Sequence, residues 1–327
     1  MISQIPILLL VYNRPKHTLA LINKLRSIKP KKIYISSDGP KENQKDFINC
    51  QKVKIIISKI DWKCKLKFNY GINNQGCRKS VSNGINWFFD NEKAGIILED
   101  DCVPNLDFFN FCKILLRKYK NQNKISVISG SNFQKKEIDK YYYYFSKYPH
   151  CWGWATWKRA WKLYDPKFSF WPKWKQSLDW KLLHKDLIEK KYWEKIFDKV
   201  YKNKIDSWAY VWTACVWKNK GLTATPNLNL IDNIGFDENA THTFALKKFE
   251  YKKSRYKNFK NNIKILHPKS IDINNEADNY VFLNHFKGIY YLWPYRIFYF
   301  IKLFFKNPNE FILKIIKIIK YSLKQSI

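Results

Sequence analysis

Short hydrophobic runs alternate with helical patterns over the first 130 residues. Residues 5–12 form one continuous apolar run, which is typical of a strand covered on both faces. Further strands are predicted where apolar runs end in polar or turn residues, and helices where apolar residues recur at helical spacing. The later strands are expected at 32–37, 53–57, 65–70, 94–98 and 125–129, with helices from Pro15, at 78–90 and at 106–119.

This alternation predicts parallel βαβ units and therefore an α/β fold with a mostly parallel, doubly wound sheet. Ligands of such sheets bind beyond the carboxyl ends of the strands. Three polar clusters follow predicted strand ends, namely Asn13-Arg14, Asp38 and Glu99-Asp100-Asp101. We expect one shared cleft to hold them.

The pattern changes near residue 131. Aromatic residues gather at 141–145 and tryptophans at 150–180, and helices are predicted at 178–201 and 206–218. Nothing marks a linker, so residues 1–245 are expected to form one catalytic domain, with a donor half at about 1–130 and an acceptor half at about 131–245. Residues 246–327 are then a C-terminal extension.

The extension ends in a basic amphipathic segment. Lys314, Lys317, Lys320 and Lys324 recur at helical spacing among Ile and Leu. A basic helix with neighbouring Trp and Tyr is typical of a segment that lies on an anionic membrane surface. The alternative is a helix docked on the domain with its lysines in water. No segment has the roughly 20 uncharged apolar residues that a membrane span needs.

The net charge of +33 allows a nucleic-acid, membrane or polyanionic partner, and coding bias explains part of it. We expect no nucleic-acid partner, because the lysines are dispersed and no binding module is recognisable. Seven cysteines without a CxxC pair indicate reduced thiols in a cytoplasmic protein. The apolar N-terminus lacks the basic start and cleavage site of a signal peptide.

The acidic triplet is the strongest chemical signal. Glu99, Asp100 and Asp101 end a buried strand, where their mutual repulsion needs a compensating cation or hydrogen bonds. A hard divalent ion such as Mn²⁺ or Mg²⁺ takes oxygen ligands and leaves positions open for phosphate oxygens. The alternative is a solvated acidic turn.

Residues 97–109 resemble the metal motif of GT-A-fold glycosyltransferases. The resemblance is closest to bacterial relatives of the N-acetylglucosaminyltransferase I type and to family 2-like nucleotide-diphospho-sugar transferases. Further matches follow in the correct order, and together they cover about residues 5–245. They lie at 11–15, 36–39, 127–132, 150–161, 205–208 and 226–243.

The resemblance implies roles for individual residues. Asp101 would bind the metal, Glu99 and Asp100 the donor sugar and ribose, and Asp206 would be the general base. The remaining donor contacts would be Arg14 and Asp38 at the nucleotide, Arg78 at the nucleotide or its phosphates, and Asn13 as a polar liner. His242 would approach the metal or the phosphates, and Trp152, Gly153, Trp154 and Trp208 would contact the acceptor or sugar.

Each of these roles has a simpler alternative. Asp206 has the position of a helix N-cap, and a lone loop histidine such as His242 usually makes local hydrogen bonds. Most of the fourteen tryptophans are expected in an aromatic core.

The resemblance implies an inverting, metal-dependent hexosyl- or N-acetylhexosaminyltransferase. Its donor would be a UDP-sugar and its acceptor a glycan or lipid-linked glycan in cell-surface polysaccharide synthesis. We expect it in the cytoplasm, peripheral on the inner face of the cytoplasmic membrane. The alternatives are a catalytically inactive glycan-binding protein, a basic nucleic-acid- or membrane-binding protein, and a nucleotidyltransferase, although the Gly-rich phosphate loop expected of the last is missing after Tyr12.

Overall fold

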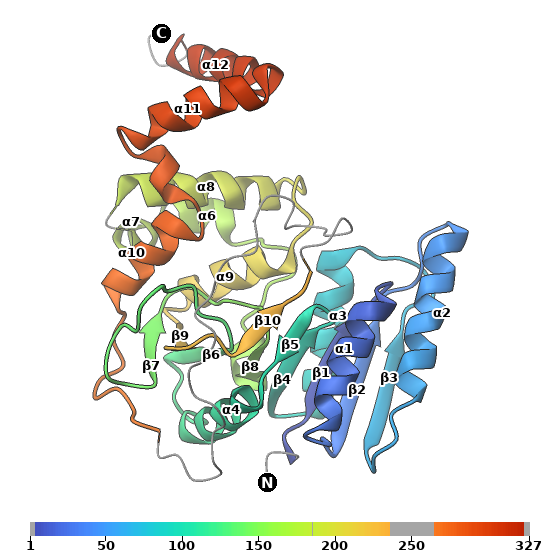
Figure 1. Cartoon of the computed structure of the whole chain (residues 1–327). Coiled ribbons are helices and arrows are strands. Elements are labelled where there is room, and N and C mark those ends of the chain that lie inside the picture. The colour runs from blue at the N-terminus through green and yellow to red at the C-terminus, as the bar shows by residue number, and fades with distance from the viewer. Residues whose placement is uncertain (1–3, 185, 236–264, 324–327) are drawn as a thin grey trace.

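The computed structural model describes residues 4–184, 186–235 and 265–323. Its centre is an eight-stranded sheet in the order β3-β2-β1-β4-β8-β6-β9-β7, flanked by helices (Figure 1). The predicted α/β class with a mostly parallel sheet is therefore confirmed. The strands are β1 (Ile7–Val11), β2 (Lys32–Ser37), β3 (Lys65–Tyr70), β4 (Ala94–Glu99), β6 (Ile125–Ser129), β7 (Tyr143–Ser146), β8 (Trp154–Trp157) and β9 (Leu222–Pro226).

Two strands run against the others. β1 pairs in parallel with β2 and β4, β2 with β3, and β6 with β9. β8 is antiparallel to both β4 and β6, and β7 is antiparallel to β9. A separate two-stranded sheet joins β5 (Cys102–Pro104) to β10 (Ile231–Asn233), with Cys102 opposite Asn233. Because β5 directly follows the acidic triplet, this pairing brings the end of β10 to that turn.

Both faces of the sheet are covered by helices. Along β1, Ile7, Leu9 and Val11 face one core and Leu8 and Leu10 the other, which accounts for the unbroken apolar run. The first core includes α1 (Pro15–Arg26), α2 (Gln44–Ser58) and α4 (Leu106–Lys118), and the second includes α3 (Cys77–Asn91), α5 (Lys158–Trp161) and α9 (Trp208–Lys218).

The strand predicted at 53–57 is wrong, because these residues lie in α2. The helix begins after Asn43, whose side chain accepts a hydrogen bond from the Asp46 amide. Cys50, Val53 and Ile57 are buried at helical spacing. The β-branched run that favoured a strand therefore packs its apolar side chains from a helix instead.

The helix predicted at 178–201 is two helices, α7 (Leu178–Leu183) and α8 (Leu187–Tyr201). Asp186 begins the second by accepting a hydrogen bond from the Ile188 amide. These helices and α6 (Trp171–Gln176) add aromatic side chains to the second core described above. Eleven of the fourteen tryptophans are buried, as the core interpretation predicted for most of them. Five of these are fully buried: Trp154, Trp171, Trp180, Trp193 and Trp212.

The C-terminal part of the chain is helical, as predicted. α10 (Asn275–Asn284) packs on the main body of the protein through Val281 and Phe282. The 3₁₀ turn η2 (Gly288–Tyr291) follows it and leads to α11 (Tyr295–Lys306) and α12 (Pro308–Leu323). In Figure 1, α11 and α12 stand away from the sheet, at the top of the molecule. Among the helices that the structure describes, none is long and apolar enough to cross a membrane.

Candidate active site

The loops that follow β1, β2 and β3 are joined by hydrogen bonds. The Tyr12 hydroxyl and the Asn13 amide both donate to the Asp46 carboxylate in the first turn of α2. Asn74 Nδ2 donates to the Tyr12 hydroxyl at 2.9 Å and to the Gly39 carbonyl at 3.0 Å. The side chain of Asn13 therefore helps to fix the loop after β1 against α2. No local pattern indicated this role of Asp46, because its partners Tyr12 and Asn13 lie 34 and 33 residues away in the chain.

The carboxylate of Asp38 is held by backbone amides. It accepts hydrogen bonds from Gly39 N at 2.9 Å, from Gln75 N at 2.9 Å and from Gly76 N at 3.1 Å. Burial raises the pKa of Asp38 above its ordinary value and outweighs these donors, which lower it. Asp38 thus fixes the loop between β3 and α3, a function that the sequence did not indicate.

The acidic triplet stands at the end of β4 beside Arg14. Arg14 Nη1 lies 3.0 Å from Asp101 Oδ2 and 3.6 Å from Asp100 Oδ1. Burial, followed by the charges of Asp101 and Asp100, raises the pKa of Glu99 to about 8. Within this group, the guanidinium of Arg14 does not offset the combined burial and repulsion, so a further cation would be favoured here.

The end of β10 closes against Asp101. The Ile234 amide donates to the Asp101 carbonyl at 2.9 Å, and His17 Nε2 lies 3.1 Å from the Ile234 carbonyl. A Cβ on Gly235 would come within 2.2 Å of Asp101 Oδ2, so glycine permits this close approach. The predicted ligand His242 lies outside the described residues.

Asp206 lies at the N-terminus of α3. Its Oδ1 accepts a hydrogen bond from the Arg78 amide at 3.2 Å, and a Cβ on Gly76 would stand 2.9 Å from its Oδ2. The N-cap of α9 is Ser207, whose hydroxyl accepts from the Tyr210 amide. The local helix-cap alternative for Asp206 therefore does not apply, although the carboxylate does bond the first turn of a helix distant in sequence.

Cys77 shows that the charged groups surround the first turn of α3. Burial and, in decreasing order, the charges of Glu99, Asp206 and Asp38 together raise the pKa of the Cys77 thiol to about 12. Arg14 acts in the opposite direction. These four groups come from the ends of different strands and helices, and the fold brings all of them within electrostatic range of one thiol.

The side chain of Arg78 turns toward the segments around residues 166 and 200–203. Its Nη2 donates to the Pro166 carbonyl at 2.6 Å, and its Nη1 lies 3.4 Å from both the Val200 carbonyl and Asn203 Oδ1. These bonds direct the guanidinium to the segments around 166 and 200–203. The residue thus links α3 to two segments that are 88 to 125 residues later in the chain, and its amide contacts Asp206.

The predicted acceptor contacts differ in their accessibility. Trp152 is partly buried beside Phe133, with ring centroids 5.2 Å apart. Gly153 has a φ of 62°, and a Cβ there would meet Ile231 at 2.4 Å, so a backbone requirement explains the glycine. Trp154 and Trp208 are 0% and 2% exposed and stack in the core. Of the three tryptophans, only Trp152 is therefore accessible to a ligand.

A cavity of about 320 Å³ adjoins Asp38. It lies between the ends of β2 and β3 and the side of α2, and its lining includes Phe47, Lys54, Tyr70 and Ile72. A space with apolar walls and a few polar groups is typical of a small-molecule site. Another cavity, of about 50 Å³ beside Phe111 and Tyr142, is far smaller and lined by none of the charged groups around α3.

Among residues 4–184, 186–235 and 265–323, no group of three His, Cys, Asp or Glu side chains could hold a metal ion on its own. The carboxylates of Asp100 and Asp101 are nevertheless ligands of the type that hard cations prefer. They fit an ion whose other positions are filled by oxygens of a phosphorylated substrate.

No family model and no curated protein matches the chain. The chain is distantly similar in structure to HddC from Yersinia pseudotuberculosis complexed with GMP-PN, at a TM-score of 0.31 and 11% identity over 48% of this chain and 78% of HddC. For the 4-diphosphocytidyl-2C-methyl-D-erythritol synthase from Anaerococcus prevotii DSM 20548 the values are 0.31 and 11%, over 60% and 85%. For the mannosyltransferase PcManGT from Pyrobaculum calidifontis, complexed with GDP-Man and Mn²⁺, they are 0.33 and 9%, over 65% and 70%.

These similarities are too distant to define a reaction. We therefore base the function on the geometry of this chain's own residues.

Proposed function

We propose that the protein is an inverting glycosyltransferase that moves a sugar, hexosyl or N-acetylhexosaminyl, from a UDP-sugar to a glycan or lipid-linked glycan. One observation supports this most: Arg14, Glu99 and Asp206 all act on the thiol of Cys77 in the first turn of α3, where Asp206 also accepts from the Arg78 amide, and Arg14 is itself paired with Asp101. A sugar bound between them has a site for its leaving group on one side and a base on the other.

The donor would lie along the ends of β1, β2 and β4. Asp38 and the cavity beside it would take the nucleobase, and Arg14 would pair with the negative diphosphate. Glu99 and Asp100 would accept hydrogen bonds from the donor sugar and ribose. Asp101 would hold Mn²⁺ or Mg²⁺, which when bound supplies positive charge to the departing diphosphate.

Asp206 would remove the proton from the attacking acceptor hydroxyl. The Arg78 amide orients its carboxylate, and the bonds of the Arg78 guanidinium to the acceptor half hold the first turn of α3 in place. Trp152 would provide an aromatic face to the acceptor, since it is partly exposed where Trp154 is not. Attack from the side opposite the diphosphate inverts the anomeric centre.

Two conservative variants separate binding from chemistry. Asp101→Asn should abolish Mn²⁺-dependent binding of UDP-sugars, whereas Asp206→Asn should retain binding and lose about 10²- to 10⁴-fold in turnover. Asp90→Asn, an exposed position at the other end of α3, is the matched control. Binding is measured by calorimetry, and transfer by release of UDP from a panel of UDP-sugars.

Full activity of Asp206→Asn would remove the assigned base. No binding of any nucleotide sugar by the intact protein would contradict the transferase, and steep salt-dependent binding to mixed DNA would then favour a nucleic-acid-binding protein.

We also propose that the enzyme acts in the cytoplasm, on the inner face of the cytoplasmic membrane. The exposed apolar surface and the basic sequence of the C-terminal helices support this location. A lipid-linked acceptor would be available there.

A further inference from the structure

The helices α11 and α12 carry a large apolar surface outside the core. Trp293 and Phe305 are 78% and 79% exposed, and Phe298 and Leu313 are 64% and 59% exposed. Scattered exposed side chains are normal on soluble proteins, but a continuous group of aromatic and branched side chains marks an interaction surface. Other members of the group are Ile297, Ile301, Phe304, Ile312 and Ile316.

The two helices pack on each other rather than on the catalytic body. Phe311 of α12 contacts Phe300 and Phe304 of α11, with ring centroids 6.2 and 5.2 Å apart. Figure 1 shows the pair beyond α10, on the side away from the sheet. We call α11, α12 and the Trp293-Pro294 turn before them the C-terminal hairpin. Its helices contain 12 and 16 residues, fewer than the roughly 20 that a span needs.

The positive charge of the C-terminal hairpin favours one binding partner for its apolar surface, an anionic membrane. From Lys287 to the C-terminus the sequence contains eight Lys or Arg and one acidic residue, Glu310. Lys302 and Lys306 are exposed on α11 beside the apolar group. A second copy of the chain would bring the same positive charge to the contact. An anionic bilayer instead offers acyl chains to the aromatics and phosphates to the lysines.

We propose that the C-terminal hairpin lies flat in the interface of an anionic bilayer and brings the catalytic body to that surface. This membrane contact deepens the proposed function. It rests on that function only in one respect, namely that the contact would bring the active site to a lipid-linked acceptor. Binding to lipid itself requires neither donor nor acceptor.

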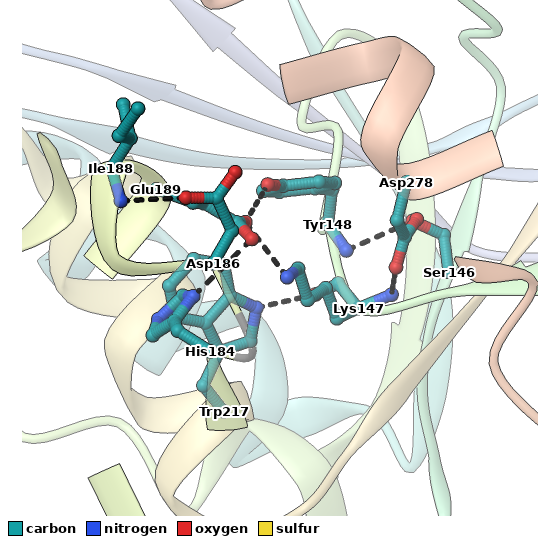
Figure 2. A network of polar contacts seen from close by, with 9 residues as sticks. All are labelled: Ser146, Lys147, Tyr148, His184, Asp186, Ile188, Glu189, Trp217 and Asp278. Carbon is teal, nitrogen blue, oxygen red and sulfur yellow. Dashed lines mark hydrogen bonds and ion pairs between the residues drawn. The ribbon is translucent and has the colours of Figure 1, made fainter. Parts of the chain in front are cut away.

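Buried polar contacts, which we call the polar joint, attach α10 to the catalytic body (Figure 2). α10 precedes the C-terminal hairpin in the chain. The Asp278 carboxylate of α10 accepts hydrogen bonds from Ser146 Oγ and, at 2.9 Å, from the Lys147 amide. Lys147 Nζ lies 2.7 Å from Glu189 of α8, which also accepts from the Tyr148 hydroxyl. These contacts are buried and tie α10 to the catalytic body. A membrane that binds the C-terminal hairpin would therefore also hold the catalytic body.

Aromatic contacts continue the joint toward the hairpin. Phe286 packs on Trp193 of α8 with ring centroids 4.9 Å apart, and Tyr291 of η2 packs on Tyr192 at 5.8 Å. The chain is thus in contact with α8 until three residues before Pro294.

The test is sedimentation of the full chain with vesicles. Wild type should bind vesicles of phosphatidylcholine with an equal part of phosphatidylglycerol, and bind phosphatidylcholine alone much more weakly. Replacing Phe298 and Phe305 by Asp should lower partitioning by at least about tenfold, since each ring loses its burial in lipid. Ile55→Asp, at an exposed isoleucine on α2, is the matched control and should bind like wild type.

A charge-reversal variant tests the same contact without changing any apolar side chain, so that loss of binding cannot be due to misfolding of the apolar group. Lys302→Glu with Lys306→Glu leaves the apolar surface intact and should lower binding to the anionic vesicles by about tenfold or more. Equal binding of wild type and both variants would overturn the proposal, as would wild type that binds neither vesicle. Release of UDP in solution is measured on the same samples, so failure of lipid binding and failure of the transferase are separate results.

Discussion

Replacing Asp278 by Asn should stabilise the protein at neutral and higher pH. The carboxyl is 4% exposed, and burial raises its pKa from 3.8 to about 6, against the hydrogen bonds from Lys147 and Ser146. The nearby Glu189 adds to the rise, whereas the Lys147 charge opposes it. Since the folded state holds the proton more tightly than the unfolded chain does, the stability contributed by this group is greatest below pH 3.8 and falls as the pH rises to about 6.

The size of the effect follows from the two pKa values. Once the group is ionised in both states, a rise from 3.8 to about 6 weakens the folded state by about 3 kcal/mol. Asn is uncharged and can accept from the Lys147 amide while its NH₂ group donates to Ser146 Oγ. The advantage of Asp278→Asn should therefore grow by about 1.4 kcal/mol between about pH 5 and about pH 8.

Urea unfolding followed by tryptophan fluorescence measures this difference at each pH. Asp179→Asn, on the surface of α7, is the control, and its difference from wild type should stay constant. An advantage for Asp278→Asn that is flat or shrinks with rising pH would refute the reasoning, because Asp278 would then be stabilised as a carboxylate by the joint.

Three further substitutions test the site and its support. Gly235→Ala places a methyl group 2.2 Å from Asp101 Oδ2 and should abolish UDP-sugar binding in calorimetry with little change in unfolding midpoint. Gly39→Ala brings a Cβ to 2.5 Å from the backbone of Asn73 and should lower the free energy of unfolding by about 1–3 kcal/mol in urea titrations. Arg159→Met loses bonds to three carbonyl oxygens at 2.9 to 3.0 Å and should cost about 2–4 kcal/mol in the same assay. An unchanged donor affinity in the first case, or an unchanged midpoint in the others, would contradict these contacts.

The elements of the first 130 residues were largely predictable because local sequence patterns mark them. The strand at 32–37 has the predicted bounds, and β4 runs directly into Glu99 as its apolar run indicated. The failure at 53–57 arose because four β-branched residues favour a strand locally, whereas the Asn43 cap and the spacing of buried side chains decide for a helix.

The sequence predicted that the charged groups lie at the ends of strands, but it did not predict which hydrogen bonds they make. Arg14 beside Asp101 follows from two adjacent parallel strands, β1 and β4. The bonds of Asp38 to the loop before α3, and of Asp206 to the Arg78 amide, join segments 37 to 128 residues apart. Such contacts depend on how helices pack, which no local pattern encodes.

The insertion of β8 into the sheet limits how this protein can be divided. β8 supplies the only described strand that joins β4 to β6, and β6 has its other partner in β9. A fragment ending at residue 130 would leave one edge of β4 and both edges of β6 without hydrogen-bond partners, which invites aggregation. Chimaeras that exchange the later part of the chain should therefore cross over beyond Trp157, and a ribosome must complete that strand before β4 can gain its second partner in the sheet.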